Sequence, residues 1–356
     1  MKTLVVCCDG TWNHPDQGGG PTNVVKMSRA VSPFGEGGRP QVVYYDEGVG
    51  TGHFMDRFLG GTVGLGLNRN VQQAYQFLVR NYEHGDKIVM FGFSRGAFTV
   101  RSLAGLIGKF GLLRKGDLDK LNILYELYRK GTDDELEANK IKVEAHPDID
   151  FLGVWDTVGT LGIPVGAFRW IGKSWYDFHD VELNAKVKHA CHAMAVDERR
   201  GPFRPTRWKT FTPEKGSLLA PDQTVWQVWF SGVHSNVGGG YPDRVLSDLA
   251  FLWMAGQARP FLSFDEDYLQ RKVERLRDGA WGFMEDSRKK HWKLFPQHTR
   301  VLGEDPTERV HRSVDLRRGN KRESDFLPRP YRPENVETYL ISLQRAGKAV
   351  DDFFVD

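Results

Sequence analysis

The chain has 356 residues, 40% of them hydrophobic and 12% aromatic, which is typical of a globular protein with a sizeable core. Its 49 basic and 46 acidic residues nearly cancel to a formal charge of +3, and no basic stretch stands free of acidic residues. We therefore expect no nucleic-acid partner. The three cysteines form no CxxC or zinc-ligand spacing, which indicates neither a zinc site nor a disulfide framework and favours a reducing compartment.

The first apolar run, Leu4–Cys8, ends at Asp9 and is too short for the hydrophobic region of a signal peptide. No segment approaches the roughly 18 apolar residues of a membrane-spanning helix. We expect synthesis in the cytoplasm, and leaderless export is compatible with this expectation. Contact with a membrane would be peripheral and from solution. The sequence does not indicate an oligomeric state.

The first third of the chain alternates predicted strands with predicted helices. Near-continuous apolar segments predict strands at Leu4–Cys8, Gln41–Tyr45 and Lys87–Phe93. Apolar residues at helical spacing predict helices at Asn68–Tyr82 and Ala97–Phe110. This alternation is typical of an α/β fold in which a mostly parallel sheet carries helices on both faces.

The remaining elements fit a single domain over residues 1–356. Further strands are predicted at Phe151–Trp155 and Val225–Phe230, and a further helix at Leu246–Ala258. Residues 111–150 are polar and contain one amphipathic helix, which indicates a helical insertion outside the sheet. Residues 160–223 are rich in Trp, Phe, Arg and Pro and are interpreted as a cap over an active site, with a simple surface excursion as the alternative. Residues 259–356 form a charged, partly helical extension packed on the domain.

The turn after the first strand, CCDGTWN from Cys7 to Asn13, is reminiscent of the Asp-x-Asp-Gly-Thr loop of some phosphatases. Cys7 stands where the first Asp is required, and a thiol can neither form an acyl-phosphate nor hold magnesium as a carboxylate does. A phosphatase built on Asp9 is therefore disfavoured. The later segment DEGVGTG lacks the third glycine of a dinucleotide fingerprint at the required spacing. We expect no cofactor and no metal.

The motif GFSRG, Gly92 to Gly96, lies between a buried strand and a buried helix, the context required of a Gly-x-Ser-x-Gly nucleophile elbow. Such a turn raises the serine hydroxyl above the carboxyl end of the sheet, where α/β folds bind ligands. The helix that follows directs its N-terminal amides toward developing negative charge. Ser94 is thus the candidate nucleophile, and a Gly-rich turn without chemistry is the alternative.

A serine needs a base and an acid that orients the base, which follow it in the order acid, then His, in this architecture. Asp156 follows the strand FLGVW and His234 follows the strand VWQVWF, so both would reach the crevice of Ser94. Asp197 is the alternative acid. We interpret it with Arg199 and Arg200 as an ion-pair cluster. His189 and His192 lie on a helix-like stretch, and His311 lacks a strand context.

The oxyanion hole of this architecture takes one amide from the residue after the nucleophile, here Arg95. A second comes from the loop after an earlier strand, where Gly10 or Thr11 would supply it. Asp9 would fix that loop by accepting hydrogen bonds.

Together these segments resemble the uncharacterised α/β-hydrolase family that includes the catalytic domain of type VI secretion phospholipase effectors. The matching segments include CCDGTWN, DEGVGTG, GFSRGAFTVRSLAG, FLGVWDTVG, HAMAVDERRGPFRP and VWFSGVHSNVGGGYP. The resemblance covers almost the whole chain and implies a triad whose positions correspond to Ser94, Asp156 and His234. It also implies ester hydrolysis, with phospholipids as substrates of some members. Asn236 stands where the family usually has Asp.

We therefore predict a serine esterase whose substrate is an ester or lipid, including a phospholipase or lysophospholipase. Arg95, Arg204 and Arg207 could meet an anionic head group, although ordinary ion pairing is the favoured explanation for them. The substrate-binding residues stay unassigned. The alternative is a catalytically silent α/β-hydrolase fold that binds a ligand or partner.

Overall fold

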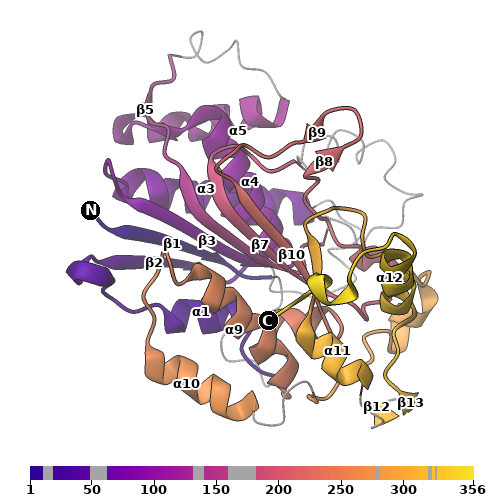
Figure 1. Ribbon diagram of the computed structural model, residues 1–356. Coiled ribbons are helices and arrows are strands. Elements are labelled where there is room, and N and C mark those ends of the chain that lie inside the picture. The colour runs from indigo at the N-terminus through magenta and orange to yellow at the C-terminus, as the bar shows by residue number, and fades with distance from the viewer. Residues whose placement is uncertain are drawn as a thin grey trace.

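The computed structural model describes residues 1–10, 19–48, 62–130, 140–158, 182–276, 281–319, 323–324 and 327–356. One eight-stranded sheet runs through the middle of the molecule (Figure 1). Its strands are β1 (Thr3–Cys8), β2 (Gln41–Asp46), β3 (Lys87–Phe93), β6 (Ile149–Trp155), β7 (Val187–Ala195), β10 (Thr224–Phe230), β11 (Glu308–His311) and β14 (Phe354–Val355). All seven pairings between neighbouring strands are parallel, so the α/β fold class predicted from the sequence is confirmed.

The strand order, β14-β11-β10-β7-β6-β3-β1-β2, places a change of direction at β1. The chain first moves outward from β1 to β2, then returns to the other side of β1 and adds strands in the opposite direction. A crevice opens at such a switch point, outside the carboxyl ends of the strands. Here the two strands that border it are β1, which ends at Cys8, and β3, which ends at Phe93.

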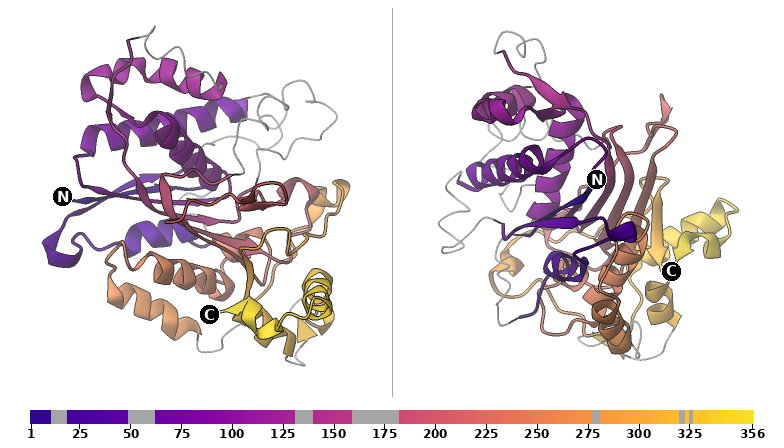
Figure 2. Two further views of the ribbon diagram at one scale, coloured as in Figure 1. Left: turned by 45° about the horizontal axis from the view of Figure 1, so that its top comes forward. Right: turned by 90° about the vertical axis from the view of Figure 1, so that its left-hand side faces the viewer.

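Helices cover both faces of the sheet (Figures 1 and 2). On one face lie α3 (Thr62–Asn81), α4 (Arg95–Phe110) and α5 (Leu121–Lys130), whose apolar side chains form one core with the sheet. On the other lie α1 (Asn23–Ala30), α9 (Val245–Ala258) and α10 (Glu266–Arg275), which form the second core. Cys7 belongs to the second core and Cys8 to the first, as expected for neighbours on a strand, and neither forms a disulfide.

The interval 160–223 requires a correction, because it contains a central strand of the sheet. Residues Val187–Ala195, interpreted from the sequence as helix-like, form β7 between β6 and β10. Alanine and methionine favour helices in isolation, but here this segment is buried between two strands, and tertiary burial overrides the propensity. The hairpin of β8 (Phe211–Thr212) and β9 (Gly216–Ser217) follows later, and residues 159–181 lie outside the described part.

The last hundred residues also contribute more than a packed extension. They supply β11 and β14, which extend the sheet at the edge opposite β2, so His311 ends a strand rather than lying outside one. A third core joins this edge to α12 (Glu334–Arg345), and α11 (Arg312–Gly319) lies beside it. The short strands β12 (Glu323–Ser324) and β13 (Leu327–Pro330) pair with each other.

Residues 111–148 lie outside the main sheet, before β6 begins at Ile149. They form β4 (Leu112–Leu113), α5 and β5 (Val143–Ala145), and β4 pairs with β5 in a separate two-stranded sheet. The apolar side of α5 joins the core of α3 and α4, so the insertion is anchored on the helical layer.

Candidate active site

Ser94 occupies a strained turn between β3 and α4. Its backbone has φ 57° and ψ −118°, a conformation costly for a residue with a side chain. Its amide donates to the Trp155 carbonyl of β6 at 3.0 Å, which fixes the turn against the neighbouring strand. Strained residues of this kind persist only where the surroundings determine them, and they gather at functional sites.

The glycines of GFSRG are required by close contact rather than by backbone conformation, since neither has a positive φ. A Cβ at Gly96 would lie 2.0 Å from the Cys8 carbonyl oxygen and 2.5 Å from that of Asp9. A Cβ at Gly92 would lie 2.5 Å from the Gly96 carbonyl oxygen. The elbow is therefore pressed against the end of β1, which brings the GFSRG and CCDGTWN motifs to the same side of the crevice.

Asp156 directly follows β6, also with positive φ. Of the described non-glycine residues only Ser94, Lys140 and Asp156 have φ above zero, and Asp156 is at 38°. Its amide donates to the Ala193 carbonyl of β7 at 2.7 Å, and its Oδ1 accepts from the Ala195 amide at 2.9 Å. The side chain is completely buried.

His234 begins the short helix α8 (His234–Gly238), which follows the turn after β10. Gly232 within that turn has φ 110°, which a residue with a side chain rarely adopts. Asn236 secures the turn: its Oδ1 accepts from the Val233 amide at 3.2 Å and its Nδ2 donates to the Phe283 carbonyl at 3.2 Å. An Asp at this position could accept the first bond but could not donate the second.

The three side chains meet in one chain of hydrogen bonds. His234 Nε2 lies 2.9 Å from Ser94 Oγ, and His234 Nδ1 lies 2.6 Å from Asp156 Oδ2. Burial lowers the pKa of His234, partly opposed by its bond to Asp156, so the imidazole is neutral at neutral pH. Neutral imidazole with Nδ1–H on a carboxylate presents Nε2 as an acceptor to the serine, the arrangement of an acyl-transfer triad.

The carboxylate of Asp156 has a partner that sequence reasoning did not find. Arg300 Nη1 donates to Oδ1 at 2.6 Å and Nη2 donates to Oδ2 at 3.0 Å. Burial alone would raise the pKa of Asp156, but the charge of Arg300 and the bond from His234 outweigh it and hold that pKa well below its ordinary value. Arg300 lies in an irregular segment before β11, where no strand or motif points to it.

Aromatic rings surround the imidazole. Phe93 lies 4.7 Å from the His234 ring centroid, and Phe203 meets the ring edge-on at 5.0 Å. Arg200 stacks on Phe203 at 3.6 Å and pairs with the buried Glu198 at 2.8 Å. The ion pair next to the site is thus Glu198–Arg200, not the predicted cluster of Asp197, Arg199 and Arg200.

Asp9 acts as the fixing residue of the loop after β1. Its carboxylate accepts hydrogen bonds from the Gly10 amide at 2.7 Å, from the Tyr45 hydroxyl at 3.0 Å and from the Thr22 hydroxyl. A buried, saturated carboxylate does not suit a phosphatase nucleophile. The Gly10 amide is engaged within the loop, and Thr11, the other predicted oxyanion donor, lies outside the described residues.

Other candidates from the sequence take different positions. Asp197 accepts from the Gly232 amide at 2.7 Å and the Tyr331 hydroxyl at 2.9 Å, so it supports the loop of His234 rather than its ring. His192 is buried in mid-sheet, where burial lowers its pKa to about 3. His311 stacks on Phe230, with its pKa lowered to about 4 by burial.

The glycines after His234 contact the protein itself rather than an open crevice. A Cβ at Gly238 would lie 1.9 Å from the Phe93 ring, and one at Gly239 would lie 2.7 Å from Thr22 Cα. These contacts lock α8 onto β3 and the start of α1.

The three arginines considered for a head group differ. Arg207 forms ion pairs with Glu304 and Glu308, which is ordinary pairing. Arg204 is exposed. Arg95, half-buried at the start of α4, has its pKa lowered to about 10 by burial. Arg95 directly follows Ser94, and no carboxylate among the described residues lies at ion-pair distance from it.

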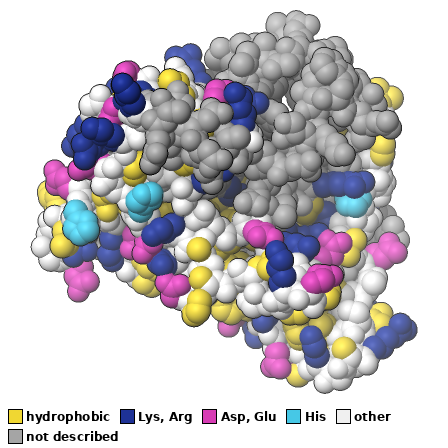
Figure 3. Space-filling view, turned by 90° about the horizontal axis from the view of Figure 1, so that it is seen from above, with side chains coloured by type: hydrophobic (Ala, Val, Ile, Leu, Met, Phe, Trp, Pro, Cys, Tyr) yellow, Lys and Arg dark blue, Asp and Glu magenta, His cyan; other side chains and the backbone are white. Residues whose placement is uncertain are grey.

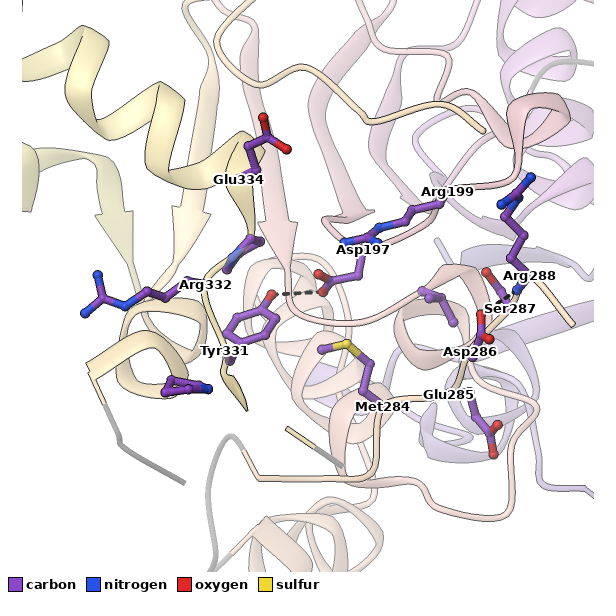
Figure 4. Close-up of a pocket in the computed structure, with 13 residues that line it drawn as sticks. Asp197, Arg199, Met284, Glu285, Asp286, Ser287, Arg288, Tyr331, Arg332 and Glu334 are labelled. Carbon is purple, nitrogen blue, oxygen red and sulfur yellow. Dashed lines mark hydrogen bonds between the residues drawn. The ribbon is translucent and has the colours of Figure 1, made fainter. Parts of the chain in front are cut away.

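A cavity of about 660 Å³ adjoins the loop of His234 (Figure 4). Its described lining includes Val233, next to His234, but neither Ser94 nor Asp156. Side chains of both charges surround it: Arg199, Glu285, Asp286, Arg288, Arg332 and Glu334, with the Asp197–Tyr331 hydrogen bond at one wall. The triad side chains therefore do not line this cavity. Its walls include Asp197 and Tyr331, which support the loop of His234.

Three further properties of the described residues bear on possible partners: surface charge, metal-site arrangement and membrane-spanning helices. On the face seen in Figure 3, basic and acidic side chains are interspersed over the described surface. Within the described ranges no group of three or more His, Cys, Asp or Glu residues has the arrangement of a metal site. No described helix has the length and apolar character needed to cross a bilayer.

A family model and one curated relative match this chain in sequence. Residues 2–257, more than half of the chain, match the family model described as "T6SS, Phospholipase effector Tle1-like, catalytic domain". The uncharacterized protein YEL023C of Saccharomyces cerevisiae is 31% identical over 231 residues, covering 57% of this chain and 32% of the yeast protein. The chain thus spans about a third of the length of this relative.

Two solved structures resemble this chain with lower sequence identity. An uncharacterized protein from Pseudomonas aeruginosa has 17% identity and a TM-score of 0.45, covering 75% of this chain and 47% of that protein. The Tle1 effector bound to the VgrG spike from the type 6 secretion system has 17% identity and a TM-score of 0.37, covering 67% of this chain and 51% of the effector.

Proposed function

The chain belongs to the family of Tle1-like phospholipase effector catalytic domains of the type VI secretion system, and from this premise we propose that it is a serine hydrolase of carboxylic esters. The observation that carries the proposal is the continuous contact from Asp156 through His234 to Ser94, with distances of 2.6 and 2.9 Å. These three residues come from the ends of three different strands, 62 to 140 positions apart, so local packing alone does not account for their meeting.

The reaction proceeds in two balanced halves. Ser94 Oγ attacks the acyl carbon while His234 Nε2 takes its proton. The tetrahedral intermediate collapses to an acyl-serine, and the imidazolium returns the proton to the leaving alcohol. A water molecule, deprotonated by His234 Nε2, then attacks the acyl-serine. The second tetrahedral intermediate collapses, the imidazolium returns the proton to Ser94 Oγ, and the acid is released. Asp156 holds Nδ1–H and stabilises the imidazolium in both halves.

The oxyanion is assigned to backbone donors. The Arg95 amide is the first of α4, and the first amides of a helix have no partner within it. Thr11 of the loop after β1 is the second donor in this proposal. Removal of one such donor typically costs about 2.7–4 kcal/mol of transition-state stabilisation.

The family suggests the class of substrate. We assign the hydrolysis of acyl ester bonds in glycerophospholipids or lysophospholipids. Phe203, which lies against His234, and Trp292, which meets Phe203 edge-on at 5.3 Å, would contact an acyl chain. Arg95, which follows Ser94 at the start of α4, is the cation that we assign to a phosphate.

The test uses a fluorophosphonate probe, which labels activated serines. Wild-type protein should be labelled, Ser94→Ala should not, and Ser102→Ala, which removes a buried serine two turns further along α4, should be labelled normally. Equal labelling of wild type and Ser94→Ala, or of neither, would contradict the triad.

A second assay addresses the substrate. Release of fatty acid from phosphatidylcholine, phosphatidylethanolamine and their lyso forms is measured with Ser94→Ala as the control. Turnover of short water-soluble esters alone would reduce the proposal to a general esterase. Intact esters across the whole panel would favour the alternative of a silent binding protein.

A further inference from the structure

Arg300 is one of the largest fully buried side chains of the molecule, and its ion pair with Asp156 excludes water from both partners. Both side chains are 0% exposed. The guanidinium meets the carboxylate with two nearly parallel hydrogen bonds, of 2.6 and 3.0 Å. This bidentate geometry fixes the carboxylate in rotation as well as in position, which a single contact cannot do.

The guanidinium is itself held by the backbone. Nη1 donates to the Ala195 carbonyl at 2.8 Å and Nη2 donates to the Phe203 carbonyl at 2.6 Å. These carbonyls belong to the end of β7 and to the short 3₁₀ turn at Gly201–Phe203. Arg300 therefore ties the triad acid to the end of β7 and to the turn whose Phe203 ring meets the imidazole.

The bonds divide the carboxylate oxygens between two tasks. Oδ1 accepts from Arg300 Nη1 and from the Ala195 amide. Oδ2 accepts from Arg300 Nη2 and faces His234 Nδ1 at 2.6 Å. Since Asp156 has a strained backbone, its side-chain direction depends on these outer contacts rather than on a regular strand or helix.

We propose that Arg300 is a positioning residue of the hydrolase: it holds the Asp156 carboxylate in the one orientation that places His234 Nε2 on Ser94 Oγ. The inference rests on the proposed function and deepens it, because the guanidinium bonds Asp156 and two backbone carbonyls rather than Ser94. It also gives a chemical role to residues beyond 257, where the family match ends.

The role requires the arginine fork rather than a positive charge alone. Lysine offers a point charge on a flexible stem and cannot form the bidentate pair. Arg300→Lys should therefore keep the buried charge balanced while it loses the orientation of the carboxylate. Arg300→Met removes both.

The first experiment separates kcat from KM. For Arg300→Lys we expect kcat to fall about 10²-fold, the cost of a misplacement of about 1 Å, with KM little changed because the side chain does not contact the substrate. Lys26→Met is the matched control, since Lys26 is also fully buried and pairs with a buried carboxylate, that of Asp248, in the layer of α1 and α9. It should lower the melting temperature and leave kcat within about threefold.

The second experiment is a double-mutant cycle with Asp156→Asn. If Arg300 acts through Asp156, Arg300→Lys should cost much less in the Asp156→Asn background than in the wild type. Losses that multiply would overturn the inference, and so would an unchanged kcat in Arg300→Lys. If Arg300→Met does not fold, Arg300→Lys carries the test.

The third readout is the acid limb of kcat/KM. The charged groups that face His234 are Asp156, Glu198 and Arg200, with Arg300 beyond Asp156. Arg300→Met removes a cation, so the imidazolium forms more readily and the limb should move to higher pH. A limb that does not move contradicts the role. Absence of Ser94-dependent turnover in the wild type would instead contradict the proposed function itself.

Discussion

Two fully buried carboxylates serve different ends in two regions of this protein. Asp156, at the carboxyl edge of the sheet, pairs with Arg300. Asp248, in the first turn of α9, lies 2.7 Å from Lys26 Nζ of α1. All four side chains are 0% exposed. The two carboxylates are therefore alike in being fully buried and in having a fully buried cation as partner.

The difference lies in what else each carboxylate contacts and in its backbone. Asp156 has φ 38° and offers one oxygen to His234, whereas Asp248 lies in a regular helix and offers its second oxygen to Arg275 of α10 at 3.0 Å. The first pair aims a titratable ring, and the second joins α1, α9 and α10. Buried ion pairs are thus weak indicators of a site unless a strained backbone and a titratable partner accompany them.

The largest expected effect separates these two carboxylates by activity. Asp156→Asn should lower kcat about 10⁴-fold, because the amide favours the wrong imidazole tautomer. Asp248→Asn should leave kcat of the folded protein within about threefold, since it alters only the helix layer. Steady-state hydrolysis of a chromogenic ester, at a temperature where both variants are folded by circular dichroism, makes the comparison. Similar losses in both would remove the distinction.

The helix layer should respond in stability instead. Lys26→Met leaves a buried carboxylate without its nearest cation and should cost about 3–5 kcal/mol of unfolding free energy. Adding Asp248→Leu should recover most of that loss, because an apolar pair of similar size replaces the ion pair. Urea unfolding measures both. A Lys26→Met protein as stable as wild type would show that the pair does not hold the layer together.

Two glycines sharpen the comparison at the level of the backbone. Gly96→Ala would place a methyl group 2.0 Å from the Cys8 carbonyl oxygen, so the elbow must move and kcat should fall about 10²-fold. Gly256→Ala in α9 meets nothing within 4 Å and should raise stability by up to about 1 kcal/mol. Kinetics and thermal melting of the two variants test this. Equal kcat values would mean that the elbow tolerates displacement.

The parts of the fold that the sequence predicted are those in which one pattern dominates. Lys87–Phe93 was predicted with the bounds of β3, because an unbroken apolar run between Asp86 and GFSRG has no competing interpretation. The prediction for the segment of β7 was wrong, because a mixture of His, Ala and Cys residues carries no strand signal until neighbouring strands bury it. The strands β11 and β14 are too short for any periodicity.

The candidate site divides in the same way. Ser94, Asp156 and His234 each follow a strand, so their convergence could be anticipated from the parallel order of the sheet. Arg300 could not, since it lies in an irregular segment 144 positions after Asp156 and arginines are common in the chain. Its role depends on a contact between distant segments that only the folded structure brings together.

The smallest expected effect concerns pH and uses the buried bases of the two regions. Burial lowers the pKa of His234 below its ordinary 6.5, so the neutral base persists to lower pH and the acid limb of kcat/KM should have its midpoint below 6.5. The unfolded imidazole binds its proton near 6.5 while the folded one does not, so stability also declines as pH falls below that value. Lys26, with a pKa lowered to about 8 by burial, stays protonated over this range, and the α1–α9 pair stays intact. Activity should therefore fall with pH while far-UV circular dichroism is unchanged, and a midpoint above 6.5 would contradict the buried, neutral base.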